Sequence, residues 1–269
     1  MQAVWFATML AMKIATFNAN SIRSRLDILL AWLDQQEPDI LCVQETKVQD
    51  AEFPAEAIQE AGYHVVFRGQ KSYNGVAVLS REEPTAVRAG FDDDGPEDAS
   101  RLLAVDFGPL TVVNTYVPQG REITHEMYAY KQQWFHRLRA YFEKHYKPDK
   151  ALVWLGDLNV AHEPIDVHNP EARKNHVCYH EDARKAFAHC REWGFEDVFR
   201  KHHPEAGHYT FFDYRTVDAA RRGMGWRIDY ILTTPTLAAR CTDAFIDIEP
   251  RLAPKPSDHT FLVAEFDNP

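Results

Sequence analysis

Short runs of apolar and β-branched residues recur along the whole chain, and this recurrence limits the possible fold more than any other feature. Two runs flank the loop around Asn74, and two flank the Gly108-Pro109 turn, as expected for β-hairpins. Longer stretches between other runs leave room for helical crossovers. The predicted strands cover residues 13–18, 39–45, 63–69, 75–81, 102–107, 110–117, 151–159, 209–214, 226–233, 241–248 and 260–266.

Apolar residues at helical spacing predict four helices between these strands. They are a leucine-rich helix from Leu26 that stops before Pro38, a short one over residues 53–61, a long one over 127–142, and one over 182–193 closed by Gly194. No linker or low-complexity stretch interrupts the pattern. A mixture of hairpins and crossovers predicts an α/β fold in which mixed sheets pack face to face with helices outside. We expect one domain over residues 12–269.

The composition is that of an ordinary globular protein, with 45% hydrophobic residues among 269. The formal net charge of −10 by itself argues against nucleic-acid binding. That argument is weak, because a metal-dependent active site concentrates carboxylates. The positions of the basic residues therefore matter more than the total.

The four cysteines form no CxxC pair and have no zinc-type spacing to a histidine. Buried, reduced thiols are the simplest interpretation, and they point to a reducing cytoplasm. Residues 1–11 are apolar, carry no Lys or Arg, and are too short to span a bilayer. We interpret them as a disordered extension and expect no membrane association. The cysteines are Cys42, Cys178, Cys190 and Cys241.

Several predicted strands begin or end with polar residues that strand packing does not require. Strand ends at one edge of a sheet can converge into a single cleft. Hard oxygen ligands of this kind suit Mg²⁺ or Mn²⁺ rather than Zn²⁺. A divalent ion beside imidazole and amide donors is suited to the hydrolysis of a phosphate ester. These polar residues are Asn18, Asn20, Glu45, Tyr116, Asp157, Asn159, Asp229, Asp258 and His259.

Taken singly, most of these residues have a simpler explanation. Asn18 and Asn20 are typical turn residues, and Asp157 could cap a turn. Glu45 could end an exposed strand, and the histidine near the C-terminus could be a hydrogen-bonded surface residue. Asp229 fits such an explanation less well, because a carboxylate inside an apolar run should be partly buried and needs a partner. Their joint occurrence favours a functional site.

Seven motifs in this order and rough spacing resemble those of the exonuclease III-like apurinic/apyrimidinic (AP) endonucleases, which belong to the endonuclease/exonuclease/phosphatase superfamily. The motifs are FNANSIR, LCVQETK, YVPQG, WLGDLN, FFDYR, GWRIDYIL and KPSDH. The resemblance covers residues 12–266, whereas one motif alone would indicate only the superfamily. It implies a four-layer α/β sandwich like that of deoxyribonuclease I, with two mixed β-sheets face to face and helices outside, in agreement with the strand pattern.

The resemblance also implies roles for the residues at the strand ends. Glu45 matches the main metal ligand, with Asn18 and Asn20 beside it. Asp157 matches the residue that orients or deprotonates the attacking water, helped by Asn159. The implied metal is Mg²⁺ or Mn²⁺.

The remaining members of the set match groups around the scissile phosphate. Tyr116 and His259 resemble donors to that phosphate. Asp258 is expected to orient His259 and is also a candidate metal ligand, and Asp229 is expected to support either the metal or the histidine. Ser21 replaces a glycine that many relatives carry, and it can still cap the following helix.

Substrate recognition is implied by an apolar trio and by basic loops. Phe211, Trp226 and Ile228 match a small pocket that admits a flipped abasic deoxyribose and excludes a nucleotide that keeps its base. Plain core packing is the alternative, although Trp226 lies in a glycine-punctuated, basic stretch that we expect to be a flexible loop. The expected phosphate and DNA contacts come from Gln119, Lys71, Arg121 and Arg227.

These features together predict a DNA-repair enzyme that hydrolyses the phosphodiester 5′ to an abasic site, with 3′-5′ exonuclease and 3′-phosphatase or phosphodiesterase activities as possible companions. The expected partner is double-stranded DNA with abasic sites or 3′-blocked ends, bound by a monomer. One alternative is a related hydrolase of small phosphoesters or lipids, which the motifs around residues 211 and 226 disfavour. Another is a non-catalytic DNA-binding module, which the complete polar set disfavours.

Overall fold

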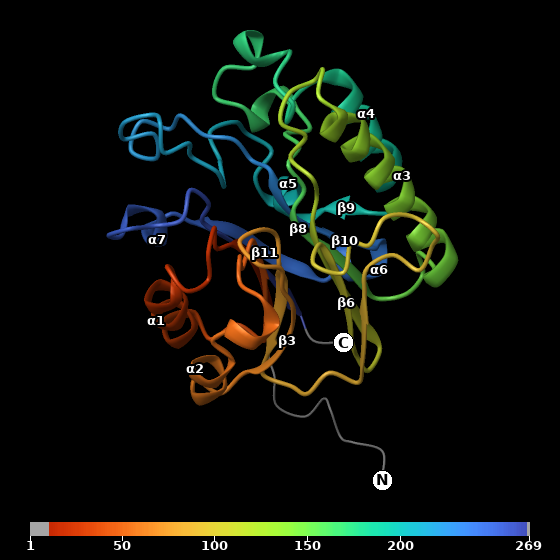
Figure 1. Cartoon of the computed structure of the whole chain (residues 1–269), viewed down its shortest axis with the longest axis vertical. Helices are drawn as coiled ribbons and strands as arrows, with labels where there is room; N and C mark the ends of the chain where they lie inside the picture. Colours follow the sequence, from red (N-terminus) through yellow and green to blue (C-terminus); the bar gives the residue numbers. More distant parts are fainter. Residues whose placement is uncertain (1–10, 268–269) are drawn as a thin grey trace.

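The computed structural model of the protein describes residues 11–267 (Figure 1). Ala11 already belongs to the first strand, so the extension expected over residues 1–11 is too long by this residue. The rest of that expected extension lies outside the described residues. The strands are β1 (Ala11–Asn18), β2 (Ile40–Gln44), β3 (His64–Arg68), β4 (Val76–Ser80), β5 (Ala86–Ala89), β6 (Leu102–Phe107), β7 (Leu110–Tyr116), β8 (Leu152–Asp157), β9 (Glu196–Asp197), β10 (Asp229–Thr233), β11 (Cys241–Asp247) and β12 (Phe261–Asp267).

The four predicted helices are present, with three shorter ones later in the chain. None of the helices in the described residues combines the length and apolar composition that a bilayer-spanning segment needs. The α-helices are α1 (Leu26–Gln36), α2 (Ala55–Glu60), α3 (Glu126–His145), α4 (Glu181–Arg191), α5 (Val198–His202), α6 (Pro235–Ala238) and α7 (Glu249–Leu252). Short 3-10 helices cover Asp50–Glu52, Pro164–Asp166 and Glu171–Arg173.

The strands form two mixed six-stranded sheets, in the orders β11-β12-β1-β2-β4-β3 and β5-β6-β7-β8-β10-β9. Each sheet contains one parallel pair, β1 with β2 in the first and β7 with β8 in the second, and the other pairs are antiparallel. Figure 1 shows α1 and α2 on one side of the sheets and α3 and α4 on the other. The predicted four-layer α/β sandwich is confirmed.

Both faces of each sheet are apolar because both are covered. Successive residues of β8 illustrate this, since Val153 belongs to the core between the sheets and Trp154 to the core under α3 and α4. On the opposite side of the molecule, the Phe261 ring stacks on Phe17 at 3.9 Å and on Trp32 of α1 at 4.0 Å. This double burial explains why the central strands lack a polar alternation.

A polar link between the sheets lies just behind the strand ends. Gln44 Nε2 donates to Asn114 Oδ1 at 2.7 Å, and Asn114 Nδ2 donates to the carbonyl oxygens of Val43 (3.1 Å) and Ala77 (2.9 Å). Gln44 and Asn114 are fully buried, so these bonds have little competition from water. The link holds β2 against β7. Gln44 directly precedes Glu45, and Asn114 lies two residues before Tyr116, so the link also positions these two residues.

Two strand predictions were wrong in extent. The strand expected over residues 209–214 is reduced to isolated bridges in which Phe211 pairs with Trp226 and with His259. The strand expected over residues 226–233 is shorter: Trp226 forms only an isolated bridge, and β10 begins at Asp229. The short edge strands β5 and β9 were not predicted, because they are four and two residues long and largely exposed. All four cysteines are free and buried, as expected.

Candidate active site

The polar residues at the strand ends converge because of the strand directions. In the parallel pairs β1–β2 and β7–β8, the carboxyl ends lie at a common edge, which carries Asn18, Glu45 and Asp157. Strands β10 and β12 run antiparallel to these, so their amino ends reach the same edge. Asp229 pairs directly opposite Asp157, and His259 lies just before β12.

The backbone at these strand ends turns in a conformation that side chains other than glycine rarely adopt. The φ angle is positive at Glu45 (50°), at Asn159 (52°) and at Asn20 (43°). Such positions cost free energy and persist only where the surrounding structure enforces them. Here each one lies where the chain leaves a strand, and its side chain joins the hydrogen-bond network at the strand ends.

Asn18 joins carboxylates from the two sheets. Its Nδ2 donates to Glu45 Oε1 and to Asp157 Oδ2, both at 2.9 Å. Asn18 and Asp157 are almost entirely buried, with exposed fractions of 0% and 1%. Asp157 also accepts hydrogen bonds from the backbone and side chain of Asn159, at 2.9 and 3.2 Å. Two carboxylates are thus held close together by amide donors.

His259 is oriented by Asp229, which corrects the expectation that Asp258 does so. Its Nδ1 lies 2.8 Å from Asp229 Oδ2, and its Nε2 lies 3.8 Å from Asp157 Oδ2. The Asp258 carboxylate instead accepts a hydrogen bond from Asn20 Nδ2 at 2.9 Å. The sequence analysis expected Asp229 to support either the metal or the histidine, and in the structure it contacts His259.

Electrostatics in this cluster follow from burial and charge pairing. Burial alone would lower the pKa of His259, but Asp229 and Asp157 raise it to about 10. Burial raises the pKa of Asp157 well above its usual range, and His259 opposes that shift. His259 and Asp157 therefore affect each other's protonation, and Asp229 favours the imidazolium form of His259. For Glu45, burial is outweighed by the nearby Lys47 ammonium and by hydrogen bonds, so its pKa is lowered.

The donor set fits a hard divalent cation. Carboxylate oxygens of Glu45 and Asp157 lie within 4.8 Å of each other, and a ring nitrogen of His259 lies within the same distance of both. Asp229 Oδ1 is a buried oxygen without a hydrogen-bond partner, so the cluster has unused acceptor capacity. A cationic group already lies here, since Lys47 Nζ is 2.7 Å from Glu45 Oε2 and donates to Asn20 Oδ1. Carboxylate and amide oxygens around a cation are the ligands of Mg²⁺ and Mn²⁺.

Tyr116 is held as a neutral phenol beside the cluster. Burial raises its pKa well above the ordinary value, and the Glu45 and Asp157 carboxylates add to the effect. The Arg101 guanidinium covers its ring, with 4.8 Å between the guanidinium carbon and the ring centroid. A phenol in this state can donate a hydrogen bond to an anion throughout the neutral pH range.

The apolar trio lies beside the histidine, but it is more ordered than expected. The ring centroids of Phe211 and His259 are 5.0 Å apart. Trp226 is only 6% exposed and Ile228 only 3%, so Trp226 is not in a flexible loop. His176 packs on Trp226 with ring centroids 4.5 Å apart, and sequence reasoning missed it because nothing in its local sequence marks it.

The basic residues divide into exposed ones and one that is buried. Lys71 and Arg121 are exposed on loops, as is the uncharged Gln119, whose Oε1 accepts a 2.7 Å hydrogen bond from the backbone of Arg121. Arg227 is 1% exposed and pairs with Asp166 at 2.7 Å and with Asp197 at 2.8 Å. The expectation that Arg227 contacts DNA was therefore wrong.

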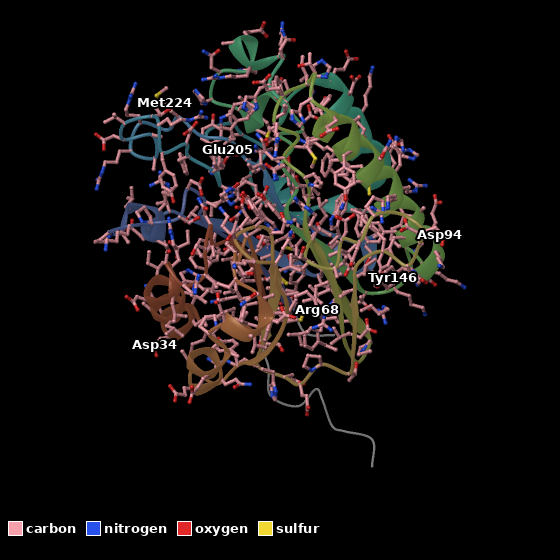
Figure 2. The ribbon with its side chains drawn as sticks, viewed as in Figure 1. Asp34, Arg68, Asp94, Tyr146, Glu205 and Met224 are labelled. Atoms are coloured by element: carbon pink, nitrogen blue, oxygen red, sulfur yellow. The ribbon has the colours of Figure 1, made fainter. Side chains whose placement is uncertain are left out.

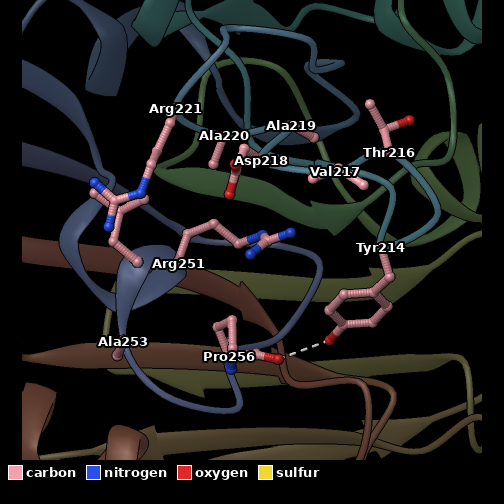
Figure 3. Close-up of a pocket in the computed structure, with 11 residues that line it drawn as sticks. Tyr214, Thr216, Val217, Asp218, Ala219, Ala220, Arg221, Arg251, Ala253 and Pro256 are labelled. Atoms are coloured by element: carbon pink, nitrogen blue, oxygen red, sulfur yellow. Dashed lines mark hydrogen bonds between the residues drawn. The ribbon is translucent and has the colours of Figure 1, made fainter.

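A further cavity of about 340 Å³ lies between the 214–221 loop and the residues before the last strand (Figure 3). Tyr214 spans it, because its hydroxyl donates to the Pro256 carbonyl at 2.7 Å. Arg221 and Arg251 line the same cavity. This places the exposed Arg221, the half-buried Arg251 and a phenol next to the segment that carries Asp258 and His259.

Comparison with known proteins identifies the family. The Endonuclease/Exonuclease/phosphatase family profile matches residues 15–259. Exodeoxyribonuclease III of Haemophilus influenzae is 36% identical over 95% of this chain and 100% of its own length. An AP endonuclease from Archaeoglobus fulgidus superposes with a TM-score of 0.93 at 55% identity, covering 95% of this chain and 99% of that one.

Two structures of NExo from Neisseria are also similar. They are described as a 3′ phosphatase bound to product DNA hairpin and as a 3′-5′ exonuclease from Neisseria meningitidis. Both have a TM-score of 0.89, at 37% and 38% identity, and each covers 95% of this chain and 99% or 100% of its own. The profile match and these nearly full-length similarities show that the chain belongs to the endonuclease/exonuclease/phosphatase family, in its exodeoxyribonuclease III and AP endonuclease branch.

Proposed function

We propose that the protein is a DNA-repair nuclease that uses Mg²⁺ to hydrolyse the phosphodiester 5′ to an abasic site in double-stranded DNA. The observation that carries the proposal is the convergence of Glu45, Asp157 and His259 beside the apolar wall of Phe211 and Trp226. The names of the relatives support it, since they include exodeoxyribonuclease III and AP endonuclease.

Glu45 would hold the metal ion, with Asn18 and Asn20 beside it and Asp258 close to Asn20. When bound, Mg²⁺ supplies charge neutralisation for the phosphate and for the leaving oxygen. The chain itself contributes the position of that ion, because Asn18 fixes the Glu45 carboxylate and Lys47 balances its charge.

Asp157 would orient or deprotonate the attacking water, with Asn159 holding the carboxylate in place. Water forms the new bond to phosphorus, and the bond from phosphorus to the 3′ oxygen breaks. The products are a 3′-hydroxyl, which takes up a proton, and a 5′-deoxyribose phosphate. Tyr116 and the His259 imidazolium would donate to the non-bridging phosphate oxygens, where negative charge accumulates in the transition state.

Phe211, Trp226 and Ile228 would select the abasic sugar. Phe211 would present an apolar surface beside His259, with Trp226 paired to it, and such a surface favours a sugar without a base over a nucleotide that must also be unstacked. The names of the Neisseria structures support companion 3′-5′ exonuclease and 3′-phosphatase activities at DNA ends. We further propose that residues 12–269 act as one catalytic domain, as a monomer, in a reducing cytoplasm that suits the free thiols.

The first test is incubation with a labelled duplex that contains one abasic analogue, with Mg²⁺ or with EDTA. The proposal expects a nick on the 5′ side of the analogue that requires Mg²⁺ and is absent from the undamaged duplex. Digestion of both duplexes from their 3′ ends would support the proposed metal site but contradict the proposed abasic pocket. No cleavage of either would contradict the proposed nuclease function.

Variants of the site separate the proposed roles. Asp157→Asn and His259→Ala should each reduce turnover by roughly 10² or more, since each removes a group that acts in the transition state. Glu45→Gln should instead raise the Mg²⁺ concentration needed for half-maximal rate. Lys185→Gln, on the exposed face of α4, is the control and should leave all parameters unchanged. Full activity of Asp157→Asn would overturn the mechanism.

A further inference from the structure

A second group of metal-ligating side chains lies on the loop after α5, and the proposed nuclease mechanism does not use it. His203, Glu205 and His208 each offer one ligand atom, and these atoms lie within 4.8 Å of one another. Figure 2 labels Glu205 on this loop. None of the three residues takes part in the active-site cluster.

His203 is oriented as a metal-binding histidine usually is. Its Nε2 lies 2.7 Å from the Ala244 carbonyl oxygen, so Nε2 carries the proton and donates it. Its Nδ1 faces Glu205 Oε1 at 3.5 Å, and in the neutral ring this nitrogen carries the lone pair that can bind a metal. A backbone carbonyl that fixes the tautomer and ring of a ligating histidine is a common support of metal sites. The ring also stacks on Phe199, with centroids 4.7 Å apart and planes 25° apart.

His208 approaches the same carboxylate from the other side. Its Nε2 lies 2.7 Å from Glu205 Oε1, and its ring meets the Phe199 ring at 70° with centroids 5.6 Å apart. The two imidazole rings are 4.9 Å apart. One aromatic side chain thus holds both histidines around one carboxylate oxygen.

The backbone of this loop is also held in place. Arg200 Nη1 donates to the carbonyl oxygens of His203 (2.9 Å) and Glu205 (2.6 Å). The charge of Arg200 is offset by Asp166, which Arg227 shares. Arg227 has Asp197 as a second partner, so this group of two arginines and two aspartates is neutral overall.

We propose that His203, Glu205 and His208 bind a transition-metal ion of the Zn²⁺ class. Two imidazole nitrogens and one carboxylate oxygen are ligands that Zn²⁺ accepts, with a fourth position left for water. Bonds of about 2.0–2.1 Å in a tetrahedron put neighbouring ligand atoms about 3.3 Å apart. The Glu205 oxygen lies at 3.5 Å from one ligand nitrogen and 2.7 Å from the other, so modest side-chain rotation accommodates the ion.

The ion would act as a clip next to the proposed abasic pocket. The loop leads directly into Thr210 and Phe211. Thr210 Oγ1 accepts hydrogen bonds from the backbone of Ile228 and of Asp229, both at 3.2 Å. Fixing residues 203–208 would therefore restrain the segment that holds Asp229 and Phe211 in position. The metal site itself does not depend on the proposed nuclease function.

The test is a titration of the full chain with Co²⁺ as a spectroscopic stand-in for Zn²⁺, in excess Mg²⁺. Glu45→Gln removes a ligand from the active-site cluster, and His64→Gln removes an exposed histidine of β3. The wild-type protein and both of these variants should bind one Co²⁺ with the visible absorption of a tetrahedral site. Zn²⁺ should displace the Co²⁺ and raise the melting temperature.

His208→Gln and Glu205→Gln should weaken this binding at least tenfold, in line with the loss of one of three protein ligands. Circular dichroism of both variants establishes that they fold, and their melting temperatures should no longer respond to Zn²⁺. The inference is overturned if wild-type protein binds no Co²⁺ in excess Mg²⁺, or if folded His208→Gln binds it as tightly as wild type. Loss of binding in Glu45→Gln alone would assign the ion to the active-site cluster and likewise overturn it.

Discussion

The charge of one histidine in the active site depends on one buried carboxylate. Asp229 is 0% exposed and its Oδ2 lies 2.8 Å from His259 Nδ1. Burial would lower the pKa of His259, but Asp229 and then Asp157 raise it to about 10. The proposed phosphate donor is therefore charged throughout the neutral range. Its charge state depends on a residue that does not touch the substrate in the proposed mechanism.

Asp229→Asn tests this dependence, because the amide keeps the shape of the side chain but removes its charge. We expect turnover to fall by roughly 10², as for other lost transition-state donors. The alkaline limb of the pH–rate profile should also move to lower pH, since His259 then loses its proton earlier. Asp258→Asn is the matched control and should move this limb less, because that carboxylate contacts Asn20. Equal shifts in the two variants would contradict the assignment.

His176 links the same pocket to the pH dependence of stability. Burial lowers its pKa to about 4, and nearby cations add to the effect, whereas the unfolded value is near 6.5. The unfolded chain therefore binds more protons between these values, so stability should fall as the pH drops from about 6.5 to about 4. After allowance for partial exposure, the loss is about 1–3 kcal/mol.

Urea denaturation across this pH range measures that loss. His176→Gln should flatten the slope of unfolding free energy against pH, because the titrating group is gone. His64→Gln, an exposed histidine, should leave the slope as in the wild type. An unchanged slope in His176→Gln would refute the prediction.

Among the elements, α3 connects the outer layer to the loops of the active site. Lys131 of this helix is fully buried, and burial lowers its pKa. Its Nζ donates to the carbonyl oxygens of Gln119 (3.2 Å), Asn159 (2.7 Å) and Val177 (2.8 Å). One lysine thus joins three loops, and one of these carries Asn159 beside Asp157.

Lys131→Met should leave these three carbonyl oxygens without their donor. Since each unsatisfied buried group costs about 1–3 kcal/mol, partly offset because a buried charge is removed, we expect a loss of ~3 kcal/mol in unfolding free energy. Chemical denaturation measures it. Lys144→Met, an exposed position on the same helix, should change the value by less than about 0.5 kcal/mol. Equal losses at both positions would exclude this anchoring role.

For the whole molecule, the net charge of −10 has to be reconciled with a polyanionic substrate. Lys71 and Arg121 are exposed on loops, whereas Arg227 is buried and forms internal ion pairs with Asp166 and Asp197. Arg227 is therefore not available to phosphates, and the negative net charge weakens non-specific binding. The proposed recognition therefore depends on local contacts at the cleft more than on the overall field.

Salt dependence of binding measures these contacts. With non-cleaving Asp157→Asn protein and an abasic duplex, log K should fall linearly with log salt concentration. Adding Lys71→Gln should reduce the slope by about 0.9, the value for one lost phosphate contact. Adding Lys185→Gln on α4 should not change it. A binding constant independent of salt would contradict the proposed footprint.

Much of this architecture is visible in local patterns. The central strands are continuous apolar runs because both of their faces are covered, and α1, α3 and α4 show helical spacing of apolar residues. The bridges at Phe211 and Trp226 were harder to place, because an isolated pairing has no periodicity to detect. The edge strands β5 and β9 escaped prediction for a related reason, since they are short and exposed.

The sequence alone determined the fold class, because the strand and helix patterns are local. It also determined the set of polar groups at the strand ends, because strand packing does not require polar residues there. Only the tertiary structure decided their partners. His259 is paired with Asp229, 30 residues away, and not with its neighbour Asp258, because β10 and β12 bring their amino ends together. Likewise, Arg227 is buried and forms ion pairs with Asp166 and Asp197. These partners are distant in the sequence, so local patterns could not predict the pairing.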